Sequence, residues 1–255
     1  MNGKERPIAV FDSGVGGISV LRHLTKLMPG EQFLYYGDSA NAPYGTKTRE
    51  QVKTLTFAAA ERLTGRGIKA LVVACNTATS AAIDDLRSAY PDLIIIGIEP
   101  ALKMAADRFP GGCIGVMATP MTLREEKFSL LLERFRERCQ VLRLPAPGLV
   151  ELIEQGQADS PETEALLSEL LGPYIGRLDA LVLGCTHYPL AEKALHRVLG
   201  RRIALLDGGE GTARETRRRL REAGLLQEGE GRVLFENSLG GEEILRLSRQ
   251  LWMER

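Results

Sequence analysis

Two cysteines close the same short motif at two places in the chain. Residues 70–77 read ALVVACNT and residues 180–187 read ALVLGCTH, so Cys75 and Cys185 each follow an unbroken apolar run. A run of this kind is typical of a strand that is buried on both faces in a parallel sheet. Each thiol should therefore lie at the carboxyl end of a strand, where open α/β sheets bind their ligands.

The two thiols could together carry out acid/base chemistry. A single cysteine at a strand end is most often a small buried hydrophobe, but two at matching strand ends, each followed by polar residues, favour an active site. Helices are expected next, over 78–89 and 189–199, and their N-termini should lower the thiol pKa below its usual value of about 8.5. Inversion of one carbon requires one group to remove a proton and another to deliver one from the opposite side. The neighbours expected to bind a carboxylate and stabilise developing charge are Asn76, Thr77, Thr186 and His187.

A glycine-rich turn, DSGVGG at 12–17, separates a strand expected at 8–11 from a helix expected at 18–27. The turn lacks the G-x-G-x-x-G spacing of a dinucleotide fingerprint, and its N–H groups suit an anion, for which we favour a carboxylate over a phosphate. Asp12 would repel that anion, so we expect it to bind a substrate ammonium. The alternative is that Asp12 only caps the helix.

Composition narrows the class of protein. The 255 residues are 44% hydrophobic and 26% charged, with zero net charge and an isoelectric point near 6.9, so neither nucleic acid nor a membrane is expected as a partner. The apolar runs of the chain are far shorter than the roughly 18 residues of a membrane span. Four widely spaced cysteines predict no disulfide framework and favour the reducing cytoplasm. With no C-x-x-C and only three histidines, no metal is expected, and no cofactor either.

The second half of the chain repeats the elements of the first. A strand expected at 114–117 leads into Ala118, Thr119 and Pro120, as 8–11 leads into the glycine-rich turn. We therefore predict an α/β fold of two pseudo-symmetric three-layer domains with mainly parallel sheets and an active site in the cleft between them. The expected boundaries are 1–98 with 208–255 for the first domain and 99–207 for the second.

Three further expectations concern segments outside the motifs. An amphipathic helix over 123–139 should place Cys139 in the core, and Cys113 begins a strand, at the wrong edge of the sheet for chemistry. Another helix is expected over 166–175. An arginine-rich helix over 210–223 also carries glutamates, which favours a solvated face over a nucleic-acid patch.

Four motifs together resemble the glutamate racemases of the cofactor-independent aspartate/glutamate racemase superfamily. They are FDSGVGG at 11–17, GD through PYG at 37–45, ACNTAT at 74–79 and GCTHYPL at 184–190, which occur in the family's order. The resemblance implies interconversion of L- and D-glutamate without pyridoxal phosphate, supplying D-glutamate for peptidoglycan. It also implies that Cys75 is the base toward D-glutamate and Cys185 the base toward L-glutamate.

The resemblance assigns further site residues. Glu154 matches an acid near the second thiol, and with Asp12 and His187 it joins the two cysteines as a catalytic residue. The implied substrate contacts are Asp12, Ser13, Pro43, Tyr44, Gly45, Asn76, Thr77, Thr119, Thr122, Thr186 and His187.

Two alternative functions remain open on the sequence. A related racemase or decarboxylase acting on another acid, such as aspartate, would use the same thiols, although a decarboxylase needs only one proton donor. A non-catalytic carboxylate-binding or thiol-redox sensor would instead join Cys75 and Cys185 in a disulfide, and would lose about two hydrogens in air by intact mass. The sequence also leaves open whether the chain forms a homodimer.

Overall fold

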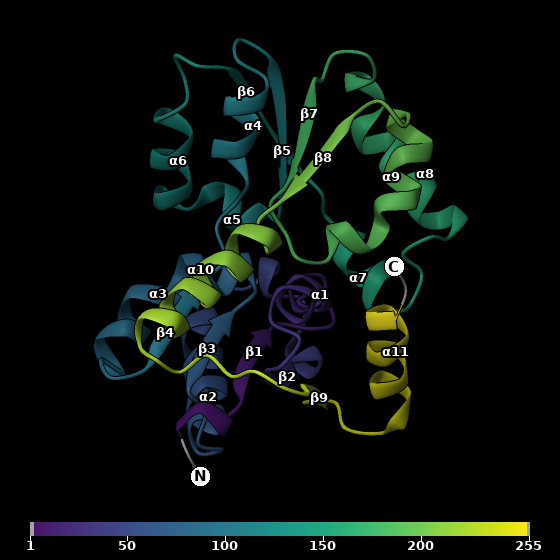
Figure 1. The fold of residues 1–255 in the computed structure, drawn as a ribbon. Helices are drawn as coiled ribbons and strands as arrows, with labels where there is room; N and C mark the ends of the chain where they lie inside the picture. The colour runs from purple at the N-terminus through teal and green to yellow at the C-terminus, as the bar shows by residue number, and fades with distance from the viewer. Residues whose placement is uncertain (1–2, 254–255) are drawn as a thin grey trace.

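The computed structural model describes residues 3–253 as two sheets, one above the other in Figure 1. The first sheet has the strand order β4-β3-β1-β2-β9 and the second the order β6-β5-β7-β8. The first contains β1 (Ile8–Asp12), β2 (Gln32–Gly37), β3 (Ala70–Val73), β4 (Ile94–Gly97) and β9 (Arg232–Asn237). The second contains β5 (Cys113–Ala118), β6 (Gln140–Pro145), β7 (Ala180–Leu183) and β8 (Ala204–Asp207). Every strand pair described is parallel, which confirms the predicted α/β fold class.

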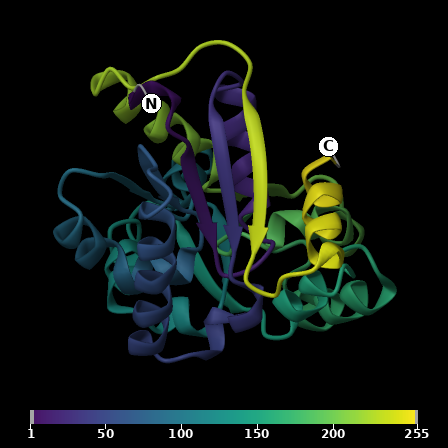
Figure 2. The same ribbon diagram turned by 90° about the horizontal axis from the view of Figure 1, so that it is seen from below.

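Helices cover both faces of each sheet. The first sheet packs between α1 (Ile18–Leu27), α10 (Gly209–Glu222) and α11 (Glu242–Met253) on one face and α2 (Arg49–Thr64) and α3 (Asn76–Ala89) on the other. The second packs between α4 (Leu102–Arg108), α5 (Pro120–Arg124) and α6 (Glu126–Glu133) on one face and α7 (Leu149–Glu154), α8 (Pro161–Leu171) and α9 (Glu192–Leu199) on the other. Figure 2 shows β9 beside β2, where the C-terminal part of the chain returns to the first sheet.

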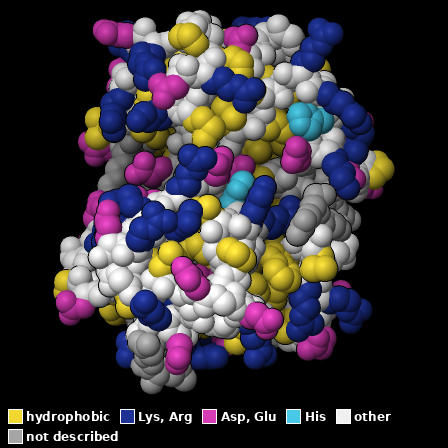
Figure 3. Space-filling view, in the orientation of Figure 1, with side chains coloured by type: hydrophobic (Ala, Val, Ile, Leu, Met, Phe, Trp, Pro, Cys, Tyr) yellow, Lys and Arg dark blue, Asp and Glu magenta, His cyan; other side chains and the backbone are white. Residues whose placement is uncertain are grey.

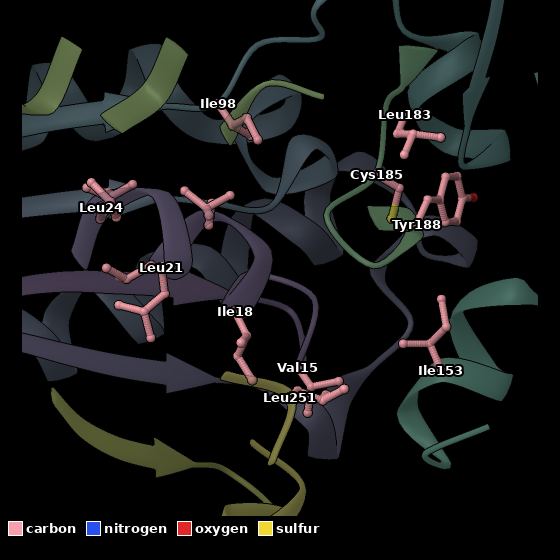
Figure 4. Packing of buried hydrophobic residues seen from close by; sticks show 14 of the residues in the cluster. Val15, Ile18, Leu21, Leu24, Ile98, Ile153, Leu183, Cys185, Tyr188 and Leu251 are labelled. Atoms are coloured by element: carbon pink, nitrogen blue, oxygen red, sulfur yellow. The ribbon is translucent and has the colours of Figure 1, made fainter. Parts of the chain in front are cut away.

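Strand residues alternate between two apolar clusters, as a sheet buried on both faces requires. In β1, Ile8 and Val10 join the cluster under α1, whereas Ala9 and Phe11 join the cluster under α2 and α3. The cluster under α1 continues into the second sheet and its helices, where Figure 4 shows Val15 and Ile18 on the same packed surface as Ile153, Cys185 and Tyr188. One apolar core therefore joins the two halves of the molecule, which are the first sheet with its helices and the second sheet with its helices.

The chain crosses between the halves twice, from β4 to α4 and from β8 to α10. The two crossings touch, since a Cβ on Gly208 would collide with the carbonyl oxygen of Glu99. The first sheet takes its strands from 8–97 and 232–237 and the second from 113–207, while the division into two domains at the expected boundaries stays a prediction.

The helices predicted over 123–139 and 166–175 are wrong in their bounds. The helix over 123–139 is broken at Glu125, whose backbone is extended at φ −65° and ψ 137°. The break follows from tertiary contacts: Met121 packs with the first half and Leu123 with the second, which fixes α5 as a separate short helix. The helix over 166–175 instead runs over Pro161–Leu171, because Ser160 caps it and Pro161 occupies its first turn.

The face of the molecule seen in Figure 3 shows no dominant charge. In Figure 3 basic and acidic side chains are interspersed over the visible face. On the arginine-rich helix α10, Arg218 pairs with Glu215 at 2.6 Å and with Glu222 at 2.7 Å, in agreement with a solvated face. Cys139 is buried, as predicted. None of the helices within residues 3–253 is both long and apolar enough to cross a membrane.

Candidate active site

Cys75 occupies the junction between β3 and α3. It is the N-cap of α3, which begins two residues earlier than predicted, and its Sγ accepts the N–H of Ala78 at 3.4 Å. The same sulfur lies 3.5 Å from Oγ of Ser13 in the glycine-rich turn. The thiol therefore lies at the carboxyl edge of the first sheet, where the sequence placed it.

The pKa of Cys75 differs from the sequence-based expectation. Burial and, second to it, the nearby carboxylate of Asp12 together raise the pKa of this thiol to about 12, while hydrogen bonds with Ser13 and Ala78 oppose the shift. The expectation that the helix N-terminus lowers the thiol pKa is thus wrong for Cys75. Desolvation and a neighbouring negative charge outweigh the helix dipole in this enclosed site.

Cys185 follows β7 and leads into a 3₁₀ helix at Tyr188–Ala191 before α9, in place of the single helix predicted from residue 189. Its Sγ lies 3.8 Å from Nδ1 of His187, whose Nε2 lies 2.5 Å from Oε1 of Glu154 at the end of α7. The Cys185 thiol therefore contacts the His187 imidazole, which in turn contacts the Glu154 carboxylate. This order is the one that activates a thiol as a nucleophile or base.

The contacts of His187 and Glu154 determine their protonation states. Burial disfavours the charged imidazole, but hydrogen bonds to Cys185 and Glu154 prevail and raise the pKa of His187 well above its ordinary value. Burial of Glu154 acts to raise its pKa, but His187, the Val15 N–H and the Ser39 hydroxyl together lower it. The carboxylate and the imidazolium therefore stabilise each other.

Asp12 is completely buried at the end of β1. Its Oδ1 accepts the N–H of Gly14 at 3.0 Å, and its Oδ2 accepts the hydroxyl of Thr186, next to Cys185, at 2.8 Å. Burial raises the pKa of Asp12, although the charge of His187 opposes that shift. The N-cap position of α1 is Gly17, so the alternative in which Asp12 caps the helix is wrong.

The glycine-rich turn packs tightly against the second half. Its Val15 N–H donates to Oε1 of Glu154 at 2.7 Å, so the carboxylate bound here is one of the protein's own. A Cβ on Gly14 would overlap the Glu154 carboxylate, and a Cβ on Gly16 would overlap the ring of His187. The two glycines therefore allow Glu154 and His187 to approach the backbone of the turn closely.

Three threonines form a second contact between the two halves, in which Thr77 comes from the first half and Thr119 and Thr122 come from the second. Oγ1 of Thr77 lies 3.2 Å from both Thr119 and Thr122, whose hydroxyls are 2.9 Å apart. Beside them, Asn76 is buried and its Oδ1 has no hydrogen-bond partner among residues 3–253. The site thus contains one free acceptor and a group of hydroxyls.

The segment that contains Pro43, Tyr44 and Gly45 packs next to the threonines. A Cβ on Gly45 would be 2.6 Å from Cβ of Thr119. The Tyr44 hydroxyl donates to Oδ2 of Asp38 at 2.6 Å, and Pro43, after a cis peptide bond, is only half-buried. Tyr44 therefore has its hydroxyl committed within its own segment.

The structure brings most of the predicted residues together in one buried group. Both cysteines, Asp12 and His187 are no more than 7% exposed. Sequence reasoning did not single out Asp38, Ser39 and Ser19, although Ser19 donates to the carbonyl of Thr186 at 2.9 Å. The position of Asp38 and Ser39 just after β2, at the same sheet edge, was the signal available. Within the described residues, no group of three or more His, Cys, Asp or Glu side chains is arranged to hold a metal ion.

Known proteins resemble the whole chain. Residues 16–216 match the family model for Asp/Glu/Hydantoin racemase. A glutamate racemase of Clostridium botulinum (strain Alaska E43 / Type E3) is 50% identical over 254 residues, covering 98% of both chains. The Francisella tularensis glutamate racemase solved with D-glutamate is 26% identical, with a TM-score of 0.84 over 99% of this chain and 95% of that one. The Escherichia coli glutamate racemase solved with L-glutamate and the activator UDP-MurNAc-ala is 30% identical, with a TM-score of 0.83 over 96% and 95%. The chain therefore belongs to the Asp/Glu/hydantoin racemase family, in which it groups with the glutamate racemases.

Proposed function

We propose that this protein interconverts L- and D-glutamate by proton transfer at the α-carbon between two cysteines. One observation carries the proposal: the adjacent residues Asp12 and Ser13 contact opposite thiol loops. Ser13 lies 3.5 Å from the sulfur of Cys75, and Asp12 accepts a hydrogen bond from Thr186, the neighbour of Cys185. A substrate bound at this turn has one thiol motif on each side. The relatives solved with D- and L-glutamate support the choice of substrate.

Conversion of L- to D-glutamate requires one thiol to act as the base and the other as the acid. The surroundings of Cys185 suit the base and those of Cys75 suit the acid. His187 takes the proton of Cys185 on Nδ1, and Glu154 stabilises the imidazolium that forms. The Cys185 thiolate then removes the α-proton, and the electron pair of the broken C–H bond delocalises into the substrate carboxylate. Cys75, whose pKa is about 12, is held as a thiol and delivers its proton to the opposite face. The cycle leaves Cys75 as thiolate, Cys185 as thiol and His187 as imidazolium. Loss of the His187 proton to solvent and uptake of a proton by Cys75 restore the starting state.

The remaining side chains suit the other groups of the substrate. The buried carboxylate of Asp12 and the free Oδ1 of Asn76 are acceptors for the ammonium group. The hydroxyls of Thr77, Thr119 and Thr122, with Thr186, are donors for carboxylates. Ser13, Pro43, Tyr44 and Gly45 complete the proposed binding surface.

Entry of substrate requires the two halves to separate, because the site is enclosed. The hydrogen bonds that join the halves at the site include Asp12 with Thr186 and Val15 with Glu154. Separation at the two touching crossings would open the site and closure would exclude water from the reaction. We also propose that the protein acts in the cytoplasm and supplies D-glutamate for peptidoglycan.

Circular dichroism of L-glutamate incubated with the purified protein, without added cofactor and in the presence of chelator, tests this function. We expect the ellipticity of the amino acid to decay to zero as the racemate forms. A parallel incubation with L-aspartate tests the related racemase. Persistent optical activity of glutamate, together with reversible loss of about two hydrogens in air by intact mass, would instead favour the redox sensor.

A further inference from the structure

A chain of hydrogen-bonded side chains connects the last strand of the first sheet to Glu154. At the end of β9, Nδ2 of Asn237 donates to Oγ of Ser39 at 3.0 Å. The Ser39 hydroxyl in turn donates to Oε2 of Glu154 at 2.8 Å. The other oxygen of Glu154 lies 2.5 Å from His187. The chain therefore reaches the imidazole beside Cys185 from a residue that lies beyond the 16–216 segment matched by the family model.

Each group in this chain has one consistent role as donor or acceptor. Oδ1 of Asn237 accepts the N–H of Leu239 at 3.0 Å, which turns the amide nitrogen toward Ser39. A serine hydroxyl has a single proton, so a hydroxyl that accepts from Asn237 has its proton free for Glu154. An ionised carboxylate only accepts, and a charge-assisted bond of this kind is stronger than a neutral one.

Both oxygens of Glu154 are thereby held. Ser39 binds Oε2, while the Val15 N–H at 2.7 Å and the ring of His187 share Oε1. A carboxylate bound at only one oxygen can rotate about its last torsion, which is broad for glutamate. Binding of the second oxygen by Ser39 removes that freedom and keeps Oε1 directed at the imidazole.

Ser39, which binds Oε2, and Asn237, which binds Ser39, both belong to the half opposite Glu154. Ser39 begins a 3₁₀ helix at Ser39–Asn41 after β2, and Asn237 ends β9, where it pairs with Gly37 of β2. A Cβ on Gly37 would lie 2.9 Å from Nδ2 of Asn237, so the two segments approach closely. Ser39 and Asn237 therefore lie together at one corner of the first sheet, at the ends of the neighbouring strands β2 and β9. This corner meets Glu154 only when the halves are together.

We propose that Ser39 and Asn237 are positioning residues for the second thiol, which hold Glu154 so that His187 activates Cys185 only in the closed protein. The proposal rests on the proposed racemase function for its kinetic consequences. The charged or titratable groups that face His187 are Glu154 from α7, Cys185 from its own loop and Asp12 from β1. Ser39 and Asn237 are uncharged, so they act on the imidazole through the orientation of Glu154.

Titration of His187 by NMR on histidine-labelled protein tests the proposal without turnover. The chain has three histidines, so His23 and His196 serve as internal controls, and loss of one signal in His187→Gln assigns the third. We expect Ser39→Ala and Asn237→Ala to lower the pKa of His187, because the freed carboxylate turns toward solvent and pairs less well with the imidazolium. Ser39→Thr keeps the hydroxyl and should keep the pKa.

Ser238→Ala is the matched control. Ser238 accepts the N–H of Ala40 at 2.9 Å, so it binds the same turn without contacting Glu154. A His187 pKa that stays unchanged or rises in both Ser39→Ala and Asn237→Ala would overturn the proposal, as would an equal drop in Ser238→Ala. If Ser39→Ala does not fold, Asn237→Ala decides the question, since it leaves the turn sequence intact.

Kinetics provide the second readout. Loss of a hydrogen bond to a charged group predicts a fall in kcat/KM of about tenfold or more in Ser39→Ala. The fall must be equal in both directions because the equilibrium constant of a racemisation is one. The isotope effect with Cα-deuterated substrate should rise for L-glutamate, where Cys185 is the base, and fall for D-glutamate. Isotope effects that move together would indicate a merely structural role. If the wild-type protein does not racemise glutamate, the proposed function fails while the titration still judges the positioning role.

Discussion

The backbone N–H of Val15 donates to Oε1 of Glu154 at 2.7 Å, so the turn after β1 and the end of α7 are in direct contact. The two residues are 139 positions apart in the sequence, one in the turn after a strand of the first sheet and the other in a helix that packs on the second. The contact is close because Gly14 and Gly16 present no side chains to Glu154 and His187. Closure of the two halves and alignment of His187 with Cys185 therefore depend on the same turn.

Gly16→Ala should impair catalysis more than stability. The added Cβ would overlap the ring of His187, and misplacement of a catalytic group by about 1 Å costs roughly a hundredfold in rate. The measurement is kcat/KM together with the free energy of unfolding. Gly211→Ala is the control, because no described atom lies within 4 Å of a Cβ there and it occupies α10, so we expect unchanged activity and about 0.5–1 kcal/mol more stability. Normal turnover in Gly16→Ala would contradict the role given to the turn.

Removal of either active-site thiol should abolish racemisation in both directions. Cys75→Ala and Cys185→Ala each remove one proton-transfer group, and we expect a loss of at least about a thousandfold in kcat/KM. Cys113→Ala and Cys139→Ala are matched controls that should keep most of the activity, because Cys113 starts β5 and Cys139 packs in the apolar cluster of the second sheet. Polarimetry starting from each enantiomer provides the measurement. Substantial turnover by Cys75→Ala or Cys185→Ala would remove that thiol from the mechanism.

Stability at alkaline pH should depend on Cys75. The folded-state pKa of this thiol is raised to about 12 by burial, above the ordinary value of about 8.5 for an unfolded chain. Its contribution is therefore fully present below about pH 8.5 and is lost as the pH rises toward 12, since the unfolded state ionises first. Between pH 8.5 and 10 the wild-type protein should lose about 2 kcal/mol that Cys75→Ala does not lose. Urea unfolding of both proteins at the two pH values measures the difference, and parallel losses would contradict the raised pKa.

Isotope incorporation tests the two-sided arrangement. If Cys75 and Cys185 face opposite sides of the α-carbon, the proton that one removes is not the proton that the other delivers. Thiol protons exchange quickly with solvent, so in heavy water the first D-glutamate formed from L-glutamate should carry deuterium at Cα while unreacted L-glutamate stays protiated. Chiral separation and mass spectrometry at low conversion measure both enantiomers. Extensive protium in the first product would point to a single base acting on both faces.

The sequence by itself determined where the reactive residues stand along the chain. The apolar runs before Cys75 and Cys185 predicted β3 and β7, and the turn at 12–17 predicted the bounds of α1 at Ile18 and Leu27. These features are local, because burial on both faces of a parallel strand and the turn chemistry of glycine leave their pattern in consecutive residues.

Only the tertiary structure decided how these residues behave. The pKa of Cys75 rises because the packed site removes water and brings Asp12 close, which no neighbour in the sequence indicates. The break at Glu125 and the bonds from Val15 and Ser39 to Glu154 likewise depend on which surfaces of the two halves meet. Desolvation and hydrogen bonding between distant segments are properties of the assembled interface, and a local pattern of residue types does not encode them.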